Sequence, residues 1–165
     1  MSARPAVFLD RDGVINRERG EHTWRMEDFE VLPTVAEAVR AINASGRPVI
    51  VITNQSGIGS GLYGHADVSR LHDYLHAHLA SQGAHLDAVY YCPHHPSRGR
   101  CLCRKPGSLL LERAIARFNI DPQGSVMVGD RERDVEAAAA VGVRGILVAP
   151  NLPLLQVLKD HALIA

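Results

Sequence analysis

The most informative stretch of this sequence is Ala6-Val7-Phe8-Leu9-Asp10-Arg11-Asp12-Gly13-Val14. Four apolar residues in a row are typical of a short strand buried inside a parallel sheet. Two aspartates follow directly, beside a glycine that permits a sharp exit of the chain. Because parallel sheets bind ligands beyond the carboxyl ends of their strands, we expect a functional site at Asp10 and Asp12.

Four further apolar segments resemble this first strand, and segments with helical spacing separate them. We expect these strands at Pro48–Ile52, Ala88–Tyr91, Val126–Val128 and Gly145–Val148. Strands that alternate with helices form a parallel sheet covered by helices. The sequence therefore predicts an α/β fold, a Rossmann-like doubly wound parallel sheet with helices on both faces.

The helices are predicted from their apolar spacing and from the residues at their ends. The first begins at a capping-box pattern formed by Thr34 and Glu37 and ends at Gly46. We expect the others over about Asp67–Gln82, after Ser108, over about Asp134–Val141, and as a short last helix that carries Leu152, Leu155 and Leu158. In the second helix an apolar stripe defines the inward side, so His72 and His76 are predicted on its solvent face.

Composition sets the class of protein. The chain has 165 residues, of which 46% are hydrophobic and 22% charged, and this excludes a disordered or fibrous protein. Eighteen basic residues balance eighteen acidic ones, and no aromatic stacking array is apparent, so nucleic acid is not an expected partner. No apolar run is long enough for a membrane helix. We expect one domain over residues 1–165 that is cytoplasmic, monomeric and independent of membranes.

Polar side chains follow the other strands too. Thr53, Asn54, Gln55 and Ser56 come after the second strand, Arg104 and Lys105 precede the third helix, and Asp130 and Asp134 follow the fourth strand. Each piece alone is also compatible with an ordinary polar turn. Together they supply a nucleophile, a cation site and positive charge, which are the parts needed to transfer a phosphoryl group. We therefore expect a small phosphorylated metabolite as the ligand.

In order and spacing these four motifs resemble those of the haloacid dehalogenase-like phosphatases. The resemblance implies that Asp10 attacks phosphorus and that Asp12 protonates the leaving oxygen and later activates water. It implies Mg²⁺ held by the side chains of Asp10 and Asp130 and by the main-chain carbonyl of Asp12. Thr53 and Lys105 would bind phosphoryl oxygens, and Asp134 would orient Lys105 or metal-bound water.

All three cysteines lie within twelve residues, so disulfides between them could not stabilise a fold of this length. With a histidine they form a Cys-x-His and a Cys-x-Cys pair, which are the ligands of a tetrahedral structural zinc site: Cys92, His94, Cys101 and Cys103. His95 is a competing ligand, and three unrelated free cysteines are the alternative to a metal site. Four protein ligands leave no open position, so this zinc would stabilise the loop before Lys105.

This loop resembles that of the subgroup containing heptose bisphosphate and histidinol-phosphate phosphatases. Residues 15–33 are too few for a large cap domain, so loops would select the substrate. The resemblance implies contacts to a sugar from Glu18, Arg19, Gly20 and Glu21, to a second phosphate from Arg104, and to the substrate from Arg131, Asn54, Gln55 and Ser56. His95 and the Thr53–Gly57 run favour the heptose enzymes, whereas the short spacing between His94 and Cys101 favours the histidinol-phosphate enzymes. We expect the heptose bisphosphate as substrate, with histidinol phosphate as the alternative.

Three other functions compete with hydrolysis of a phosphate ester. A sugar phosphotransferase would use the same aspartates, and a zinc-loop binding module would have lost catalysis. Gly59, Gly61 and Gly64 match a dinucleotide-binding pattern, but they begin too far beyond the strand. We expect these glycines to form a loop that borders the active site.

Overall fold

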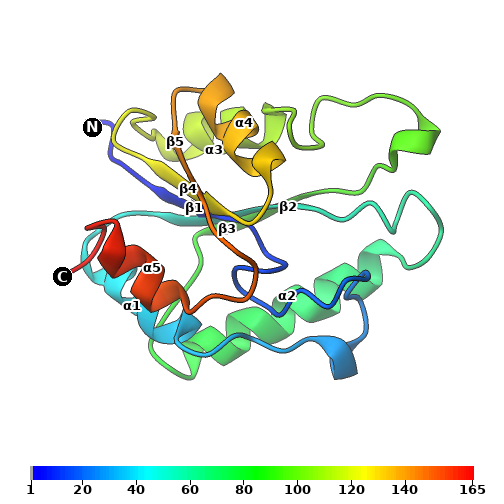
Figure 1. Cartoon of the computed structure of the whole chain (residues 1–165), viewed down its shortest axis with the longest axis horizontal. Coiled ribbons are helices and arrows are strands. Elements are labelled where there is room, and N and C mark those ends of the chain that lie inside the picture. Colours follow the sequence, from blue (N-terminus) through cyan, green and yellow to red (C-terminus); the bar gives the residue numbers. More distant parts are fainter. Residues whose placement is uncertain (1) are drawn as a thin grey trace.

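The computed structural model of the chain describes residues 2–165 and contains one five-stranded parallel sheet (Figure 1). The strand order is β3-β2-β1-β4-β5, so the chain crosses over the sheet in both directions from the central β1. The strands are β1 (Val7–Leu9), β2 (Val49–Asn54), β3 (Ala88–Cys92), β4 (Val126–Gly129) and β5 (Arg144–Leu147). This confirms the predicted doubly wound sheet.

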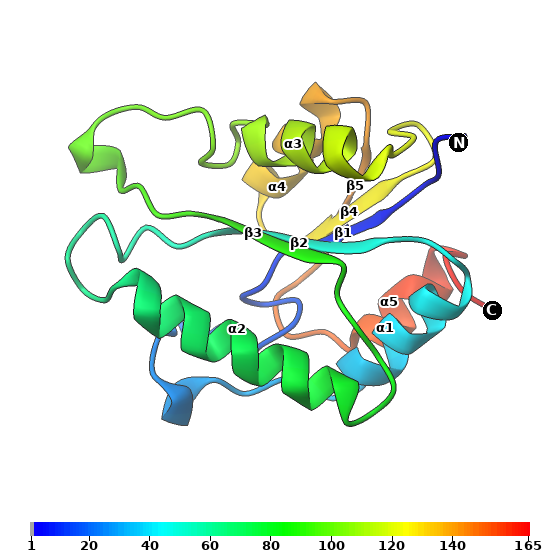
Figure 2. The same ribbon diagram turned by 180° about the vertical axis from the view of Figure 1, so that it is seen from behind.

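Helices cover both faces of the sheet, as the two opposite views show (Figures 1 and 2). On one face lie α1 (Val35–Ala44), α2 (His65–Ala80) and α5 (Leu154–Asp160), and on the other lie α3 (Leu109–Phe118) and α4 (Glu132–Ala140). Single-turn 3₁₀ helices occupy Met26–Asp28 and Pro96–Arg98. The side chains of β1 alternate accordingly, because Val7 and Leu9 belong to the first core and Phe8 to the second.

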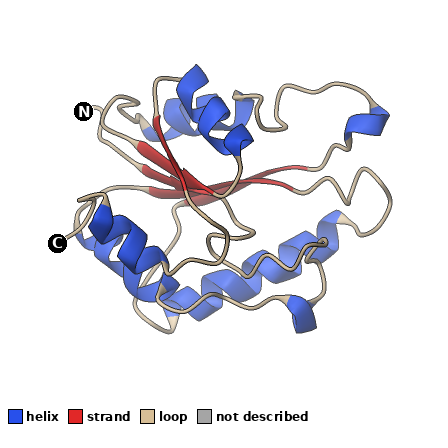
Figure 3. Cartoon of the chain, in the orientation of Figure 1, coloured by secondary structure: helices blue, strands red, loops and turns tan. Residues whose placement is uncertain are grey.

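The loops that carry the polar motifs leave the sheet from the ends of its strands (Figure 3). The glycine-rich loop after β2 and the cysteine-bearing loop after β3 lie side by side. Gly59 N donates to Pro93 O at 2.8 Å, and a Cβ at Gly59 would lie 2.6 Å from the backbone nitrogen of His95. Gly59 therefore allows the two loops to pack closely.

Two local predictions are wrong. Thr34 precedes α1 with a positive φ of 72° and makes no side-chain cap; its Oγ1 instead accepts a hydrogen bond from Leu155 N. The start of α5 competes with α1 for this hydroxyl, so Thr34 and Glu37 form no capping box. His72 is buried rather than on a solvent face, for a reason that lies in the active site. Among residues 2–165, no helix is long and apolar enough to cross a membrane.

Candidate active site

The predicted polar side chains converge on a cavity of about 280 Å³ beyond the carboxyl ends of β1, β2 and β4. Asp10, Asp12 and Asp130 line it from the strand ends. The surrounding loops and the start of α4 contribute Glu18, Gly20, Glu21, His22, Thr23, Asn54, Gln55, Ser56, Arg131 and Arg133. The topology brings these groups together because all strands point the same way.

Lys105 connects two of the buried aspartates. Its Nζ lies 3.0 Å from Asp10 Oδ1 and 2.5 Å from Asp134 Oδ1, and it donates to Ile52 O at 2.7 Å. Only 1% of Lys105 is exposed, and Asp134 is fully buried. Burial alone would lower the pKa of Lys105, but the two carboxylates outweigh burial and raise it. Lys105 is therefore a permanent positive charge beside Asp10.

Asp10 has an unusual proton affinity for an aspartate. Burial raises the pKa of Asp10 to about 7. The positive charge of Lys105 lowers this pKa, whereas the nearby carboxylates, Asp134 first among them, raise it. Burial also raises the pKa of Asp130. Several carboxylates around one small space repel one another, and a cation among them removes that repulsion.

The carboxylates present a set of oxygen ligands that fits Mg²⁺. Oxygens of Asp10, Asp130 and Asp134 lie within 4.8 Å of one another. Asp134 is already engaged, because one oxygen pairs with Lys105 and the other accepts a hydrogen bond from Arg131 N at 3.1 Å. Asp10 pairs with Lys105 and accepts from Arg11 N through Oδ1 alone, so its other oxygen and the carboxylate of Asp130 are the ligands left for a hard cation. Gly13 permits this approach, since a Cβ there would lie 2.2 Å from Asp130 Oδ2.

Asp12 is held by three hydrogen-bond donors. Arg11 Nη2 and Asn16 Nδ2 donate to its Oδ1 at 2.8 and 2.9 Å, and Gln55 Nε2 donates to its Oδ2 at 3.1 Å. Burial alone would raise the pKa of Asp12, but the Arg11 charge and these hydrogen bonds outweigh burial and lower it. The Asp12 carboxylate is therefore ionised and bonded to Arg11, Asn16 and Gln55. Its pKa is lowered, whereas that of Asp10 is raised.

Arg11 explains the burial of His72. The arginine side chain is fully buried, donates to Thr23 O at 2.9 Å, and approaches His72 Nε2 with its Nη1 at 3.5 Å. Burial lowers the pKa of His72 to about 3, and the charge of Arg11 acts in the same direction. Because arginine only donates hydrogen bonds, a neutral imidazole with an unprotonated Nε2 suits this position. The sequence does not distinguish His72 from His76, because the difference between them is the contact of His72 with the buried Arg11.

The residues after β2 hold the site together. Gln55 donates to Thr53 Oγ1 at 3.0 Å as well as to Asp12, and Tyr63 Oη donates to Gln55 Oε1 at 2.8 Å. Asn54 makes two hydrogen bonds to the backbone of Lys105, at 3.0 and 3.2 Å. Thr53 is 1% exposed, and Gln55 links it to Asp12 by donating to both side chains. These amides fix the relative positions of the loops that follow β1, β2 and β3.

The loop after β1 is anchored by a residue that the motifs did not reveal. Asn151 Oδ1 accepts from Glu18 N at 2.7 Å, and its Nδ2 donates to Glu18 O at 3.1 Å. Glu18, Gly20 and Glu21 line the cavity. Arg19 instead forms ion pairs with Glu21 and Asp28, and Arg104 does not line the cavity. The structure thus brings three of the four predicted loop residues to the site.

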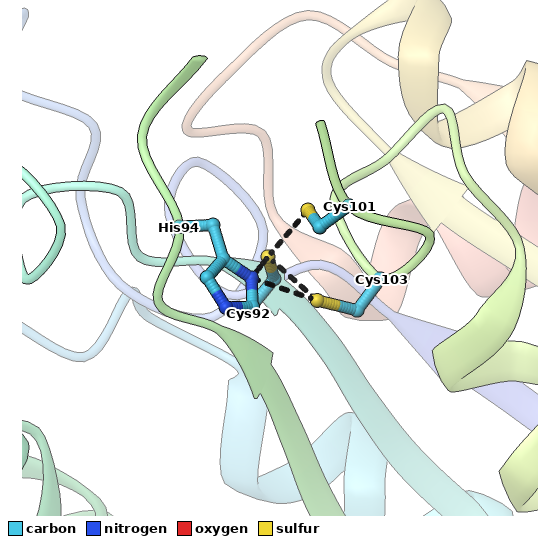
Figure 4. Close-up of side chains that lie close together, drawn as sticks. All are labelled: Cys92, His94, Cys101 and Cys103. Atoms are coloured by element: carbon cyan, nitrogen blue, oxygen red, sulfur yellow. Dashed lines mark hydrogen bonds between the residues drawn. The ribbon is translucent and has the colours of Figure 1, made fainter. Parts of the chain in front are cut away.

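The predicted zinc ligands cluster at the ends of the loop after β3 (Figure 4). Cys92 Sγ lies 2.9 Å from Cys103 Sγ and 3.7 Å from Cys101 Sγ, and His94 Nδ1 lies 3.2 Å from Cys103 Sγ. The four ligand atoms fall within 4.8 Å of one another, as one tetrahedral ion requires. His95 is turned away and bonds Ser97 through its Nδ1. Burial raises the pKa of the Cys92 thiol, and a bound cation would reverse this.

Comparisons with known proteins agree with this geometry. Residues 102–152 match the model of a HAD-hydrolase-like family. The chain is 40% identical over 159 residues to the D-glycero-beta-D-manno-heptose-1,7-bisphosphate 7-phosphatase of Vibrio cholerae serotype O1, covering 92% of this chain and 85% of that protein. It is 39% identical over 157 residues to the enzyme of the same name from Escherichia coli K12, covering 91% and 82%.

Solved structures show the same relationship. A crystal structure of D,D-heptose 1,7-bisphosphate phosphatase from B. bronchiseptica, complexed with magnesium and phosphate, superposes with a TM-score of 0.84 at 33% identity, covering 94% of this chain and 86% of that chain. The corresponding protein from Burkholderia thailandensis gives a TM-score of 0.66 at 32% identity, covering 95% and 85%. The chain belongs to the HAD-like phosphatases, in the family that contains the heptose bisphosphate phosphatases.

Proposed function

We propose that this phosphatase removes the 7-phosphate of D-glycero-D-manno-heptose 1,7-bisphosphate in a reaction that requires Mg²⁺. The observation that carries the proposal is the Asp10–Lys105–Asp134 cluster at the floor of a cavity whose walls carry both acidic and basic side chains. The names of the similar proteins support the sugar bisphosphate, and the magnesium and phosphate bound to the B. bronchiseptica protein support the cofactor and the reaction.

Asp10 is the proposed nucleophile. Its carboxylate oxygen attacks phosphorus, the bond from phosphorus to the sugar oxygen breaks, and an aspartyl-phosphate forms on Asp10. Lys105 is fixed by Asp134 and by Ile52 O, so it offsets negative charge on the phosphoryl oxygens without having to move. Thr53, whose Oγ1 accepts a hydrogen bond from Gln55, would supply a hydroxyl to the phosphoryl oxygens. Water then attacks the aspartyl-phosphate, which returns Asp10 and releases phosphate.

Asp12 is the proposed proton carrier. It would protonate the leaving sugar oxygen and then remove a proton from the attacking water. In the ligand-free arrangement Arg11, Asn16 and Gln55 keep it ionised. A phosphate dianion close by favours the protonated acid, so substrate binding must release Asp12 from at least one of these donors.

Magnesium fits the oxygens of Asp10 and Asp130, with the main-chain carbonyl of Asp12 as the third proposed ligand. When bound, the ion would reduce the repulsion between the Asp10 carboxylate and the phosphate dianion. The residues of the chain keep this arrangement in place, since Gly13 leaves room for Asp130 and Lys105 holds Asp10 from the other side.

The affinity for Mg²⁺ is expected to depend on pH. The metal-free pKa of Asp10 is raised to about 7, so a proton must leave before the carboxylate can bind the ion. Affinity is therefore full well above pH 7 and falls as the pH drops through that value, by about tenfold between pH 8 and pH 6. Calorimetric titration with Mg²⁺ at both values measures this, and equal affinities would contradict the raised pKa.

The four-ligand cluster is proposed to hold a structural Zn²⁺. Cys101→Ser removes one thiolate, and we expect zinc content to fall from about one ion per chain to less than about half of that. His95→Ser is the matched control, because His95 lies next to the cluster and bonds Ser97 instead. Metal analysis of both purified variants provides the readout. Undiminished zinc in Cys101→Ser would show that Cys101 is not a ligand.

The substrate proposal is tested by comparing kcat/KM for heptose 1,7-bisphosphate, fructose 1,6-bisphosphate and histidinol phosphate with Mg²⁺ present. We expect the heptose to be preferred by at least about a hundredfold. A preference for histidinol phosphate would instead make the short spacing between His94 and Cys101 the informative feature. Product analysis in the same assays distinguishes free phosphate from a phosphoryl group transferred to a second sugar.

A further inference from the structure

Part of the loop after β1 forms one wall of the cavity, at residues 18–23. The members of this segment that line the cavity are Glu18, Gly20, Glu21, His22 and Thr23. In the described residues 2–165, the hydrogen bonds that residues 18–22 form outside this loop are the two that Asn151 makes with the first of them. At the far end the ring of His22 contacts Tyr63, and the buried Arg11 donates to Thr23 O at 2.9 Å. Asn151 therefore holds one end of this wall.

Contacts inside the segment do not attach it to the sheet. Gly20 N donates to Glu18 Oε1 at 2.9 Å. Arg19 pairs with Glu21 and with Asp28, which lies in the same loop. These contacts move with the loop, so they shape the segment without fixing its position.

Asn151 lies in the loop after β5, which runs beside the loop after β1 in both views (Figures 1 and 2). Its carboxamide accepts from Glu18 N at 2.7 Å and donates to Glu18 O at 3.1 Å. A carboxamide carries both an acceptor and a donor, so it satisfies both backbone groups of one residue at once. The backbone N of Asn151 donates to Gly13 O at 2.8 Å. Asn151 thus bonds the exit of β1 through its backbone and the 18–23 segment through its side chain.

We propose that Asn151 is a positioning residue for substrate binding, which holds the 18–23 segment where it contacts the organic part of the phosphate ester. The inference rests on the proposed function, in which that part is a heptose. Asn151 does not line the cavity, so it acts through the backbone of Glu18. The proposed nucleophile Asp10 is held by Lys105 instead. Loss of the carboxamide should therefore weaken the binding of the sugar and leave the chemistry at Asp10 intact.

The test is Asn151→Gly. Glycine keeps the backbone N–H that bonds Gly13 and adopts the φ of 68° without strain, so the substitution removes the carboxamide alone. We expect KM for heptose 1,7-bisphosphate to rise about tenfold, as the loss of two hydrogen bonds between uncharged groups predicts, with kcat within about twofold of the wild type. The inhibition constant of inorganic phosphate, which has no organic part, should not change.

Hydrogen–deuterium exchange measures the attachment directly and needs no substrate. Peptides that cover residues 18–22 should exchange at least about tenfold faster in Asn151→Gly than in the wild type, because Glu18 N loses its acceptor. Asn119→Gly is the matched control. Asn119 also has a positive φ, of 49°, but it lies at the end of α3 outside the cavity, so KM and the exchange of residues 18–22 should equal those of the wild type.

A KM in Asn151→Gly equal to that of the wild type would overturn the proposal. So would equal rises in KM and in the phosphate inhibition constant, because a general disturbance of the site weakens both alike. Failure of the heptose proposal would be seen separately, as negligible turnover of heptose 1,7-bisphosphate by the wild type. The same constants are then measured for whichever of fructose 1,6-bisphosphate and histidinol phosphate it prefers. With any substrate, exchange of residues 18–22 at the wild-type rate in Asn151→Gly would show that Asn151 does not hold the segment.

Discussion

Asp10→Asn is expected to reduce kcat by at least about a thousandfold while the protein remains folded. An amide oxygen is a poor nucleophile, so the first bond to phosphorus cannot form. The amide has nearly the same shape as the carboxylate, and Lys105 retains Asp134 as its partner. Phosphate release with saturating Mg²⁺ measures the loss, and thermal unfolding shows that the fold persists.

The control for this substitution is Asp73→Asn. Asp73 is an exposed aspartate of α2 outside the cavity, so the same change of charge should leave kcat within about twofold of the wild type. A purified Asp10→Asn protein that retained more than about a tenth of the wild-type kcat would exclude Asp10 as the nucleophile.

Lys105→Met is expected to destabilise the fold as well as abolish turnover. Lys105 is 1% exposed, and its removal leaves Asp10 and Asp134 buried without a cation. Breaking a buried ion pair from one side typically lowers the free energy of unfolding by about 3–5 kcal/mol. Urea unfolding at pH 8 measures the difference from the wild type.

The loss of stability in Lys105→Met should become smaller in acid. Without the lysine the pKa of Asp10 rises further, because Lys105 is the main influence that opposes burial. A carboxyl whose folded pKa is raised destabilises the fold progressively as the pH rises above its unfolded pKa, and this effect is complete above its folded pKa. The wild type and the variant share this effect up to about pH 7, the pKa of Asp10 in the wild type, and the additional loss in the variant appears above that value. The variant should therefore be closest to the wild type near pH 5 and furthest from it at pH 8.

Lys159→Met is the matched control, since Lys159 is the other lysine of the chain and is exposed on α5. Its free energy of unfolding should stay within about 0.5 kcal/mol of the wild type at both pH values. A loss in Lys105→Met that was the same at pH 5 and pH 8 would show that packing of the lysine, and not charge, stabilises the site.

The sheet could be predicted from the sequence because its central strands, β1, β2 and β4, are buried on both faces. Residues 6–9 and 126–128 are uninterrupted apolar runs, and the structure places both in the core. Strand ends shifted by one or two residues, as at Asn54 and Cys92, because the ladder continues into the polar motifs. Because the strands are parallel, the predicted carboxylates that follow them lie together at the carboxyl-terminal edge of the sheet.

What the sequence could not predict depends on contacts between distant segments. Asn151 holds Glu18 across 133 residues, and Thr34 bonds the start of α5 instead of capping α1. His72 is buried because Arg11 points inward, which no local pattern of the helix indicates. Each of these side chains satisfies a backbone group or a charge that only the assembled fold places beside it.

The cluster of three cysteines and one histidine was predicted because its spacing is local. Cys92 and His94 are two residues apart, and the structure keeps them together with the later Cys-x-Cys pair. The roles of these residues stay predictions that the experiments above address.

The central claim is that phosphoryl transfer passes through Asp10. It is tested most directly by rapid acid quenching of the enzyme during turnover of heptose 1,7-bisphosphate with Mg²⁺, followed by mass spectrometry of its peptides. We predict one phosphoryl group on Asp10 and none in Asp10→Asn. Turnover without any phosphorylated peptide, or with the phosphoryl group on another residue, would contradict the mechanism.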